Sequence, residues 1–504
     1  MKNESTVVER IVTTTDSGTL SRYWIISAMV GLLFSSVTGL LVSLERIDLS
    51  AANIFSTADE VFQFWSAHRV SLVLIAVLPL MIGLATLVVP RQVGASRLVF
   101  PKMSAFSFWV WLFGALIIII GFLANGGVGT PDAGSESQSV ALTFVGVLLA
   151  IVGLCGASAS LLTTIVAGRI PGLALLEIPA FSWSVLIAGT MWIATLPVLA
   201  ANVVLIYVDM RGREPVNFGS EQVAWEQISW AFTHPQVYLW VLPLLGVVAE
   251  IISAAFKGKP SNALLAISIG LMGLAGFGAY AQTYFDLGTP VFEEAFSIIH
   301  AFVAIPYVLF FIAVIASVVV KNRKQFDKRA ITPIVLAALS IVFLFQGVIV
   351  GALHVIGPLE LATRSTVTSQ IVLTLGAGVL AFMAAFAWWG ELLTGKSISQ
   401  QKVLITGIIF HLGVGLFAIA DLLVGFTGQN DFTGASEFAA GTDSSNWGDA
   451  LNIISLIGSS LFMVGVISAV AVGCQHAFSK TPAEGNPWDL ETLEWTLGEK
   501  EEVA

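Results

Sequence analysis

The feature that most constrains this sequence is a set of twelve apolar runs, each long enough to cross a lipid bilayer. A transmembrane helix needs about 20 mainly apolar residues. Only 11% of the 504 residues are charged, whereas soluble domains carry roughly 25%, so most of the surface must face lipid. We therefore predict an all-α integral membrane protein that forms a twelve-transmembrane-helix bundle. The runs cover residues 23–44, 66–89, 106–124, 139–167, 179–208, 225–255, 262–285, 297–320, 330–353, 366–390, 403–427 and 450–473.

The distribution of basic residues among the loops predicts the orientation of the bundle. Lys and Arg gather in alternate loops, most densely in residues 321–329, whereas the last loop of the other set is wholly acidic. Loops on the cytoplasmic side carry the excess of Lys and Arg. We predict a multi-pass protein of the plasma membrane with both termini in the cytoplasm. Its parts are an N-terminal segment (1–22), one membrane domain (23–473) and a C-terminal tail (474–504).

Net charge and cysteine content exclude several other classes of protein. A net charge of −10 argues against nucleic acid as a partner. The partner that the apolar runs imply is the lipid bilayer. The two cysteines, Cys155 and Cys474, lie in or beside apolar runs. Two such residues provide neither a disulfide framework nor a thiolate metal cluster.

A short motif in the sixth run carries the clearest resemblance to a known family. The stretch His234-Pro-Gln-Val-Tyr238 resembles the His-Pro-Glu-Val-Tyr segment of haem-copper oxidase subunit I, the catalytic subunit of cytochrome c and quinol oxidases. Other family segments follow in chain order, among them Pro90-Arg-Gln-Val-Gly-Ala95, Trp388-Trp389 and Asn486-Pro-Trp488. The resemblance implies the family's twelve-helix fold over almost the whole chain.

The resemblance also implies a reaction, the reduction of oxygen to water coupled to proton pumping, which needs two haems and a copper. It places His234 at the first copper ligand and Tyr238 at the position one helical turn later that the family links to it. The second and third copper ligands fall at Gln282 and Thr283. One imidazole and one phenol make a poor copper site. We therefore expect His234 and Tyr238 to be hydrogen-bonded inside the bundle.

The haem ligands of the family are altered in the same way. The two haem-binding histidines of the tenth span fall at Thr368 and Gln370, and hydroxyls and amides are poor substitutes for imidazole on iron. His68 occupies the position of the other ligand of the low-spin haem. Its neighbour is Arg69, where the family has a glycine that leaves room for the ring. We expect neither haem nor copper to be bound; both would be present if the family activity is retained.

Two charged residues inside apolar runs form a candidate buried charge pair. Arg69, near the outer end of the second span, and Asp421, near the outer end of the eleventh, are predicted at similar depth. Ionisable groups inside a membrane are costly and normally pair with one another. We predict that Arg69 pairs with Asp421, or with Asp431 of the following loop, and fills the vacated haem pocket.

Three functional hypotheses follow from these residues. The first is a cytochrome c oxidase subunit I-like pseudoenzyme, a non-catalytic subunit of an oxidase-like complex with subunit II-like and III-like membrane proteins. The second is a terminal oxidase subunit that retains the family activity in the respiratory chain. The third is a transporter or ion-conducting helix bundle that reuses the emptied core. Haem and copper content separates the first two hypotheses.

Overall fold

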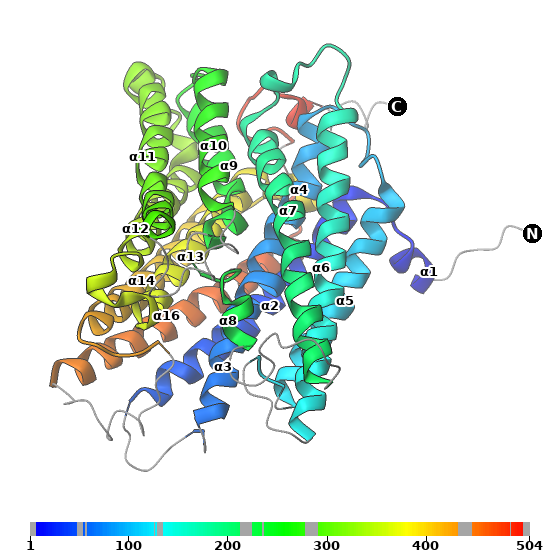
Figure 1. Cartoon of the computed structure of the whole chain (residues 1–504). Helices are drawn as coiled ribbons and strands as arrows, with labels where there is room; N and C mark the ends of the chain where they lie inside the picture. The colour runs from blue at the N-terminus through cyan, green and yellow to red at the C-terminus, as the bar shows by residue number, and fades with distance from the viewer. Residues whose placement is uncertain are drawn as a thin grey trace, which may run out of the picture.

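The protein is a bundle of long helices (Figure 1). The structure, a computed structural model, describes residues 7–47, 54–55, 58–124, 126–128, 135–211, 224–233, 236–277, 291–431, 446–483 and 485–496. Within these residues there is no β-strand, only two isolated bridges. The principal helices are α1 (Val7–Val12), α2 (Ser17–Glu45), α3 (Ala58–Val70), η1 (Ser71–Val77), α4 (Leu78–Gln92), α5 (Pro101–Leu123), α6 (Ser135–Ala167), α7 (Ala180–Met210), α8 (Ala224–Ser229), η3 (Gln236–Val241), α9 (Pro243–Ala255), α10 (Asn262–Gly276), α11 (Val291–Asn322), α12 (Ile331–His354), α13 (Thr366–Thr394), α14 (Gln400–Phe426) and α16 (Asn446–Ala477). Shorter turns are η2 (Leu175–Glu177), η5 (Arg323–Gln325), η6 (Lys328–Ala330), η7 (Gly357–Leu359) and η8 (Leu361–Thr363).

Ten of the twelve predicted runs are helices long and apolar enough to cross a membrane, within the described residues. The sixth and seventh runs, 225–255 and 262–285, contain shorter apolar helices instead, α9 and α10. Pro243 begins α9, and one residue separates it from the end of the 3₁₀ segment η3. A proline lacks the N–H that a continuous α-helix needs at that point. The structure therefore divides the sixth run into α8, η3 and α9.

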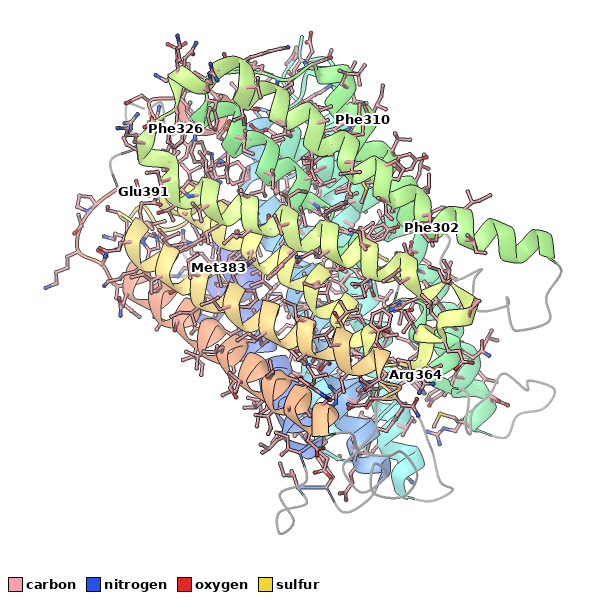
Figure 2. All side chains as sticks on the ribbon, turned by 90° about the vertical axis from the view of Figure 1, so that its left-hand side faces the viewer. Phe302, Phe310, Phe326, Arg364, Met383 and Glu391 are labelled. Atoms are coloured by element: carbon pink, nitrogen blue, oxygen red, sulfur yellow. The ribbon has the colours of Figure 1, made fainter. Side chains whose placement is uncertain are left out.

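Two spans form the centre of the bundle, namely α13 and the continuous span made by α3, η1 and α4. The apolar window of the α3–η1–α4 span is 100% buried, and that of α13 is 94% buried. Helices that are apolar all round are typical of such central positions. The windows of α5, α7, α11 and α16 are only 33–44% buried, so these helices form the outer layer. Figure 2 shows Arg364, which lies just before α13, and Glu391, which lies near the end of α13, at opposite ends of the bundle.

Small residues allow some of these helices to pack closely. A Cβ atom added to Gly114 of α5 would lie 2.4 Å from the backbone nitrogen of Ala150 in α6, and one added to Gly146 would lie 2.8 Å from the nitrogen of Ile118. Contacts this short require glycine. In a membrane, where lipid is as apolar as the helix surface, such backbone approach is a main source of helix association.

A π-helical segment interrupts the central span two residues after Arg69. In η1 the turns are wider than in an α-helix, and the N–H of Leu78 bonds to the carbonyl of Val73, five residues earlier. All residues of Ser71–Val77 are buried. Single π turns inside α-helices frequently occur at functional sites. The segment therefore directs attention to the residues that immediately precede it.

The C-terminal tail packs against the end of the bundle where α2 begins and α13 ends, which we call the tail face. The ring of Trp488 stacks on Trp388 with 4.3 Å between centroids, and its indole N–H donates to the Trp388 carbonyl oxygen at 3.0 Å. Nη1 of Arg329 forms an ion pair with Oδ2 of Asp489 at 2.9 Å. Stacked aromatic rings add to the stabilisation from burial, so these contacts fix the tail on the bundle.

Docking of the tail is expected to weaken as the pH rises, because of Glu494. This side chain is 4% exposed, and burial raises the pKa of its carboxyl above the ordinary 4.5. The docked tail favours the protonated carboxyl of Glu494. The contribution of this group to docking is therefore fully present below the ordinary pKa and is lost as the pH rises through the raised pKa. Hydrogen exchange of residues 486–496 should therefore be faster in the wild type than in Glu494→Gln at high pH. Comparing the two proteins at each pH cancels the intrinsic exchange rate, and an unchanging ratio would contradict the prediction.

Candidate cofactor site

His68 lies between α3 and α2 with one ring nitrogen bonded. Nδ1 is 2.7 Å from the carbonyl oxygen of Ser35, an acceptor, so Nδ1 carries the proton. A Cβ atom at Gly39 would lie 2.6 Å from the ring, which shows why position 39 is glycine. Nε2 is buried and has no hydrogen-bond partner among the described residues. A carbonyl at one ring nitrogen and a free second nitrogen are typical of histidines that bind metals.

Arg69, the residue after His68, belongs to a network of buried polar groups. Its guanidinium forms an ion pair with Asp431 and donates to the Thr368 hydroxyl at 2.8 Å. That hydroxyl donates to Oδ1 of Asp431 at 2.6 Å, and the Thr368 N–H donates to the same oxygen at 3.2 Å. The guanidinium also lies 4.0 Å from the centroid of Trp65, a cation–π distance. These contacts neutralise the charge of Arg69 inside the bundle.

A second buried ion pair lies next to the first. Nη1 of Arg46 donates to both carboxylate oxygens of Asp421, at 3.0 and 2.9 Å, and the Ser455 hydroxyl donates to Oδ1 at 2.7 Å. Nη2 of Arg46 donates to the backbone carbonyl of Asp431 at 3.0 Å. The two pairs therefore form one network with two cations and two anions.

The candidate pair Arg69–Asp421 is replaced in the structure by these two pairs. Asp421 binds Arg46, while Arg69 binds Asp431, the second partner considered for it. The physical reason is the position of Arg46. It caps the end of α2 and is 5% exposed, so it reaches Asp421 inside the bundle, whereas its place in the sequence indicates a loop.

The loop after α14 is folded so that Asp431 points into the bundle. The Asp431 N–H donates to the carbonyl of Thr363 at 3.1 Å, and the Ser365 N–H donates to that of Gln429 at 3.0 Å. The Gln429 amide exchanges two hydrogen bonds with Asn452 of α16, at 3.0 and 3.2 Å. These bonds tie the loop to the beginning of α13 and to α16. Asp431 is consequently part of a fixed site.

Little empty space remains around these side chains. The cavity at the site has a volume of about 10 Å³, which is close to the space that one water molecule requires. The region between His68 and Thr368 is therefore filled by protein atoms. The residues that line the cavity are Gly39, Val42, Ser43, Arg46, Trp65, His68, Thr368 and Phe417.

The remaining candidate residues are distributed as follows. Gln370 of α13 is fully buried, and neither atom of its amide group has a partner among the described residues. The Tyr238 hydroxyl is buried and donates to the Ala275 carbonyl at 2.9 Å. His234, Gln282 and Thr283 lie outside the described residues. In the part of the chain that is described, no three His, Cys, Asp or Glu side chains form a group suited to a metal ion.

Sequence reasoning missed Arg46 and Ser455. A signal for Arg46 was present, because the buried charge of Asp421 requires a cation and Arg46 lies two residues after the end of an apolar run. Two arginines, Arg46 and Arg69, satisfied that requirement equally well. No local pattern marked Ser455, since serines are common in transmembrane helices.

The fold and this buried site define a multi-span membrane protein with a polar cluster between its central helices. Residues 19–461 match the family model described as cytochrome C and quinol oxidase polypeptide I. The chain therefore belongs to the cytochrome c and quinol oxidase polypeptide I family, the subunit I family of respiratory oxidases. The resemblance to this family found in the sequence is confirmed.

Individual relatives match over nearly the whole chain. The chain is 26% identical over 514 residues to the probable cytochrome c oxidase subunit 1-beta of Nocardia farcinica, covering 97% of this chain and 84% of the relative. It is 26% identical over 495 residues to cytochrome c oxidase subunit 1 of Bacillus subtilis, covering 94% and 77%. A chain of a heme-copper terminal oxidase dimer has a TM-score of 0.71 at 15% identity, with 93% of this chain and 85% of that chain covered. At that identity the structural match shows the fold alone.

Proposed function

We propose that this protein is a non-catalytic, subunit I-like member of an oxidase-like membrane complex, which has lost redox catalysis. The observation that carries the proposal is the network of Arg69, Asp431 and Thr368. It joins Arg69, the neighbour of His68, to Thr368, where the family resemblance places a haem-binding histidine. The charges of Arg69 and Asp431 neutralise one another there, so the network needs no added group to balance its charge.

The residues present do not fit a haem held by two histidines. Nε2 of His68 is suited to be one ligand, because it is buried and unpartnered among the described residues. On the facing helix, the Thr368 hydroxyl is already engaged by Arg69 and Asp431, and Gln370 offers an amide. The cavity of about 10 Å³ accepts no porphyrin ring. A haem would have to break the ion pair before it could enter.

The donors at the copper positions support the same proposal. Of the three positions only His234 supplies an imidazole, and Gln282 and Thr283 supply an amide and a hydroxyl. Stable copper sites draw mainly on imidazole and thiolate ligands. The phenol of Tyr238 donates to the Ala275 carbonyl. We propose a structural role for Tyr238 in joining η3 to α10.

The proposal extends to the surroundings of the chain. We propose twelve membrane spans, with the sixth and seventh formed around α9 and α10, and both termini on the cytoplasmic side of the plasma membrane. Partners would be membrane proteins similar to oxidase subunits II and III. The support for partners is the membership of the subunit I family. Co-purification of the tagged chain from its own membranes identifies them.

A visible spectrum with metal analysis tests the loss of the redox centres. The protein purified from haem-replete cells is expected to show no Soret band and far less than stoichiometric iron and copper. The subunit 1 relative of Bacillus subtilis, purified in the same way, is the positive control. A Soret band that disappears in His68→Ala, with stoichiometric iron and copper, would restore the terminal oxidase as the function.

A further inference from the structure

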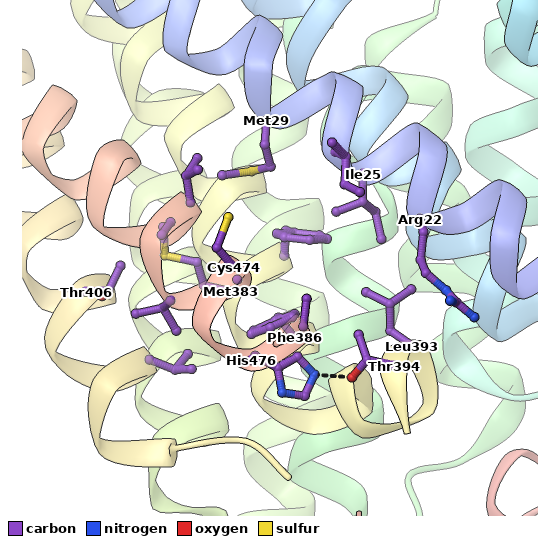
Figure 3. A pocket seen from close by; sticks show the side chains of 18 of the residues that line it. Arg22, Ile25, Met29, Met383, Phe386, Leu393, Thr394, Thr406, Cys474 and His476 are labelled. Carbon is purple, nitrogen blue, oxygen red and sulfur yellow. Dashed lines mark hydrogen bonds between the residues drawn. The ribbon is translucent and has the colours of Figure 1, made fainter. Parts of the chain in front are cut away.

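A second, much larger cavity opens on the tail face, far from the charge network. It has a volume of about 360 Å³ and lies among α2, α13, α14 and α16. This volume is in the range of pockets that bind small molecules. Figure 3 shows its side chains, with Arg22 at one edge and Met29 further along α2. The cavity shares none of its lining residues with the charge network.

The interior of this cavity is apolar and opens toward the lipid side of the bundle. Met29, Met383 and Phe386 line it, together with other aliphatic and aromatic residues. At its edge, Ile26 and Val30 of α2 are 63% and 57% exposed. No acidic side chain is among the lining residues. Methionine side chains adapt their shape to flexible apolar ligands, so the interior suits a hydrocarbon chain.

The polar end of the cavity carries one charged group, Arg22. Its guanidinium is exposed, and it attracts the carboxylate of Asp16, which does not line the cavity. That carboxylate also accepts a hydrogen bond from the N–H of Thr19 at 2.7 Å, which caps α2 and holds the carboxylate outside the cavity. Arg22 and Met29 are seven residues apart on one face of α2, which corresponds to about 10 Å along the helix axis. The cavity thus combines a cationic end with an apolar channel.

Two other polar side chains at this end, Thr394 and His476, already form hydrogen bonds. The Thr394 hydroxyl and Nε2 of His476 are 2.5 Å apart, and Nδ1 of His476 is 3.2 Å from the Ser397 carbonyl oxygen. Figure 3 shows the Thr394–His476 contact at the polar end. A quinone needs hydrogen-bond donors for its ring carbonyls, and both ring nitrogens of His476 are already in hydrogen-bond contacts. A phosphate needs a cation, which Arg22 provides.

We propose that this cavity binds an anionic phospholipid, with one acyl chain in the apolar channel and the phosphate at Arg22. Charge complementarity supports this occupant, since a cation stands at the mouth and no acid lines the interior. Because α2 is long and apolar enough to cross a membrane, we expect Arg22, near its beginning, at the level of the lipid headgroups. A juxtamembrane arginine contributes about 1 kcal/mol to the binding of anionic lipids, equivalent to about a fivefold preference.

Glycines provide a matched pair of variants for the test. A Cβ atom at Gly473, which lines the cavity, meets nothing within 4 Å, and the same holds at Gly270 of α10, outside the cavity. Gly473→Leu therefore fills the cavity without a backbone clash, and Gly270→Leu is its control. Both full-length proteins are placed in nanodiscs with equal amounts of phosphatidylglycerol and phosphatidylcholine. Native mass spectrometry then counts the retained lipids.

The wild type and Gly270→Leu are expected to retain phosphatidylglycerol, and Gly473→Leu to retain one molecule fewer. Arg22→Gln should keep a lipid but lose the preference for phosphatidylglycerol, by about fivefold. Equal retention in the two leucine variants would overturn the proposal, as would an unchanged preference in Arg22→Gln. A quinone that is retained by the wild type and lost from Gly473→Leu would assign the cavity to a different occupant and also overturn it.

Discussion

Asp431→Ala is expected to lower the free energy of unfolding by about 3–5 kcal/mol, the typical cost of leaving a buried charge without its partner. The change removes the counter-ion of Arg69 and the acceptor of the Thr368 hydroxyl together. Both remaining groups are 6% exposed or less, so water cannot replace the carboxylate easily. Unfolding of the purified protein in sodium dodecyl sulfate, followed by tryptophan fluorescence, measures the change.

A partly exposed ion pair at the same end of the bundle provides the control. Glu360 is 3.5 Å from Arg364, and its side chain is 77% exposed. Exposed pairs contribute about 0–1 kcal/mol, so Glu360→Ala should leave unfolding nearly unchanged. The double variant Arg69→Leu with Asp431→Ala should regain part of the loss, because it removes the uncompensated charge. Similar unfolding curves for Asp431→Ala and Glu360→Ala would show that the network is not a stabilising unit.

Trp488→Ala is expected to release the C-terminal tail from the tail face. The change removes the stack on Trp388 and a hydrogen bond to its carbonyl. Replacing a buried tryptophan by alanine costs about 3–5 kcal/mol, which raises the open population of the tail by about 100-fold or more. A glutamate-specific protease, which needs access to the buried Glu494, should cut the variant much faster than the wild type.

Phe478 serves as the control for the tail, because it is an aromatic residue nearby that is 86% exposed. Phe478→Ala should be cut at Glu494 at the wild-type rate. The membrane helices should remain intact in both variants, which a size-exclusion profile checks. Cleavage of Trp488→Ala at the wild-type rate would mean that the tail is held by other contacts.

Ten long helices and the family were predictable from sequence because both depend on local information. Apolar length alone indicates a membrane helix, and the segment around His234 and Tyr238 keeps the order of residues typical of the family. The break in the sixth run was less predictable. Pro243 marks a point where the backbone can change, but η3 and α9 depend on how neighbouring helices satisfy the freed carbonyls.

The sequence by itself determined the membrane character of this protein, its family and the residue types at the family's ligand positions. Only the tertiary structure decided which arginine binds which aspartate. Arg46 and Asp421 are 375 residues apart, and Arg69 and Asp431 are 362 apart. Hydropathy and residue identity are properties of single positions along the chain. The pairing of buried charges depends instead on the angle and depth at which distant helices meet, and packing of the whole bundle sets both.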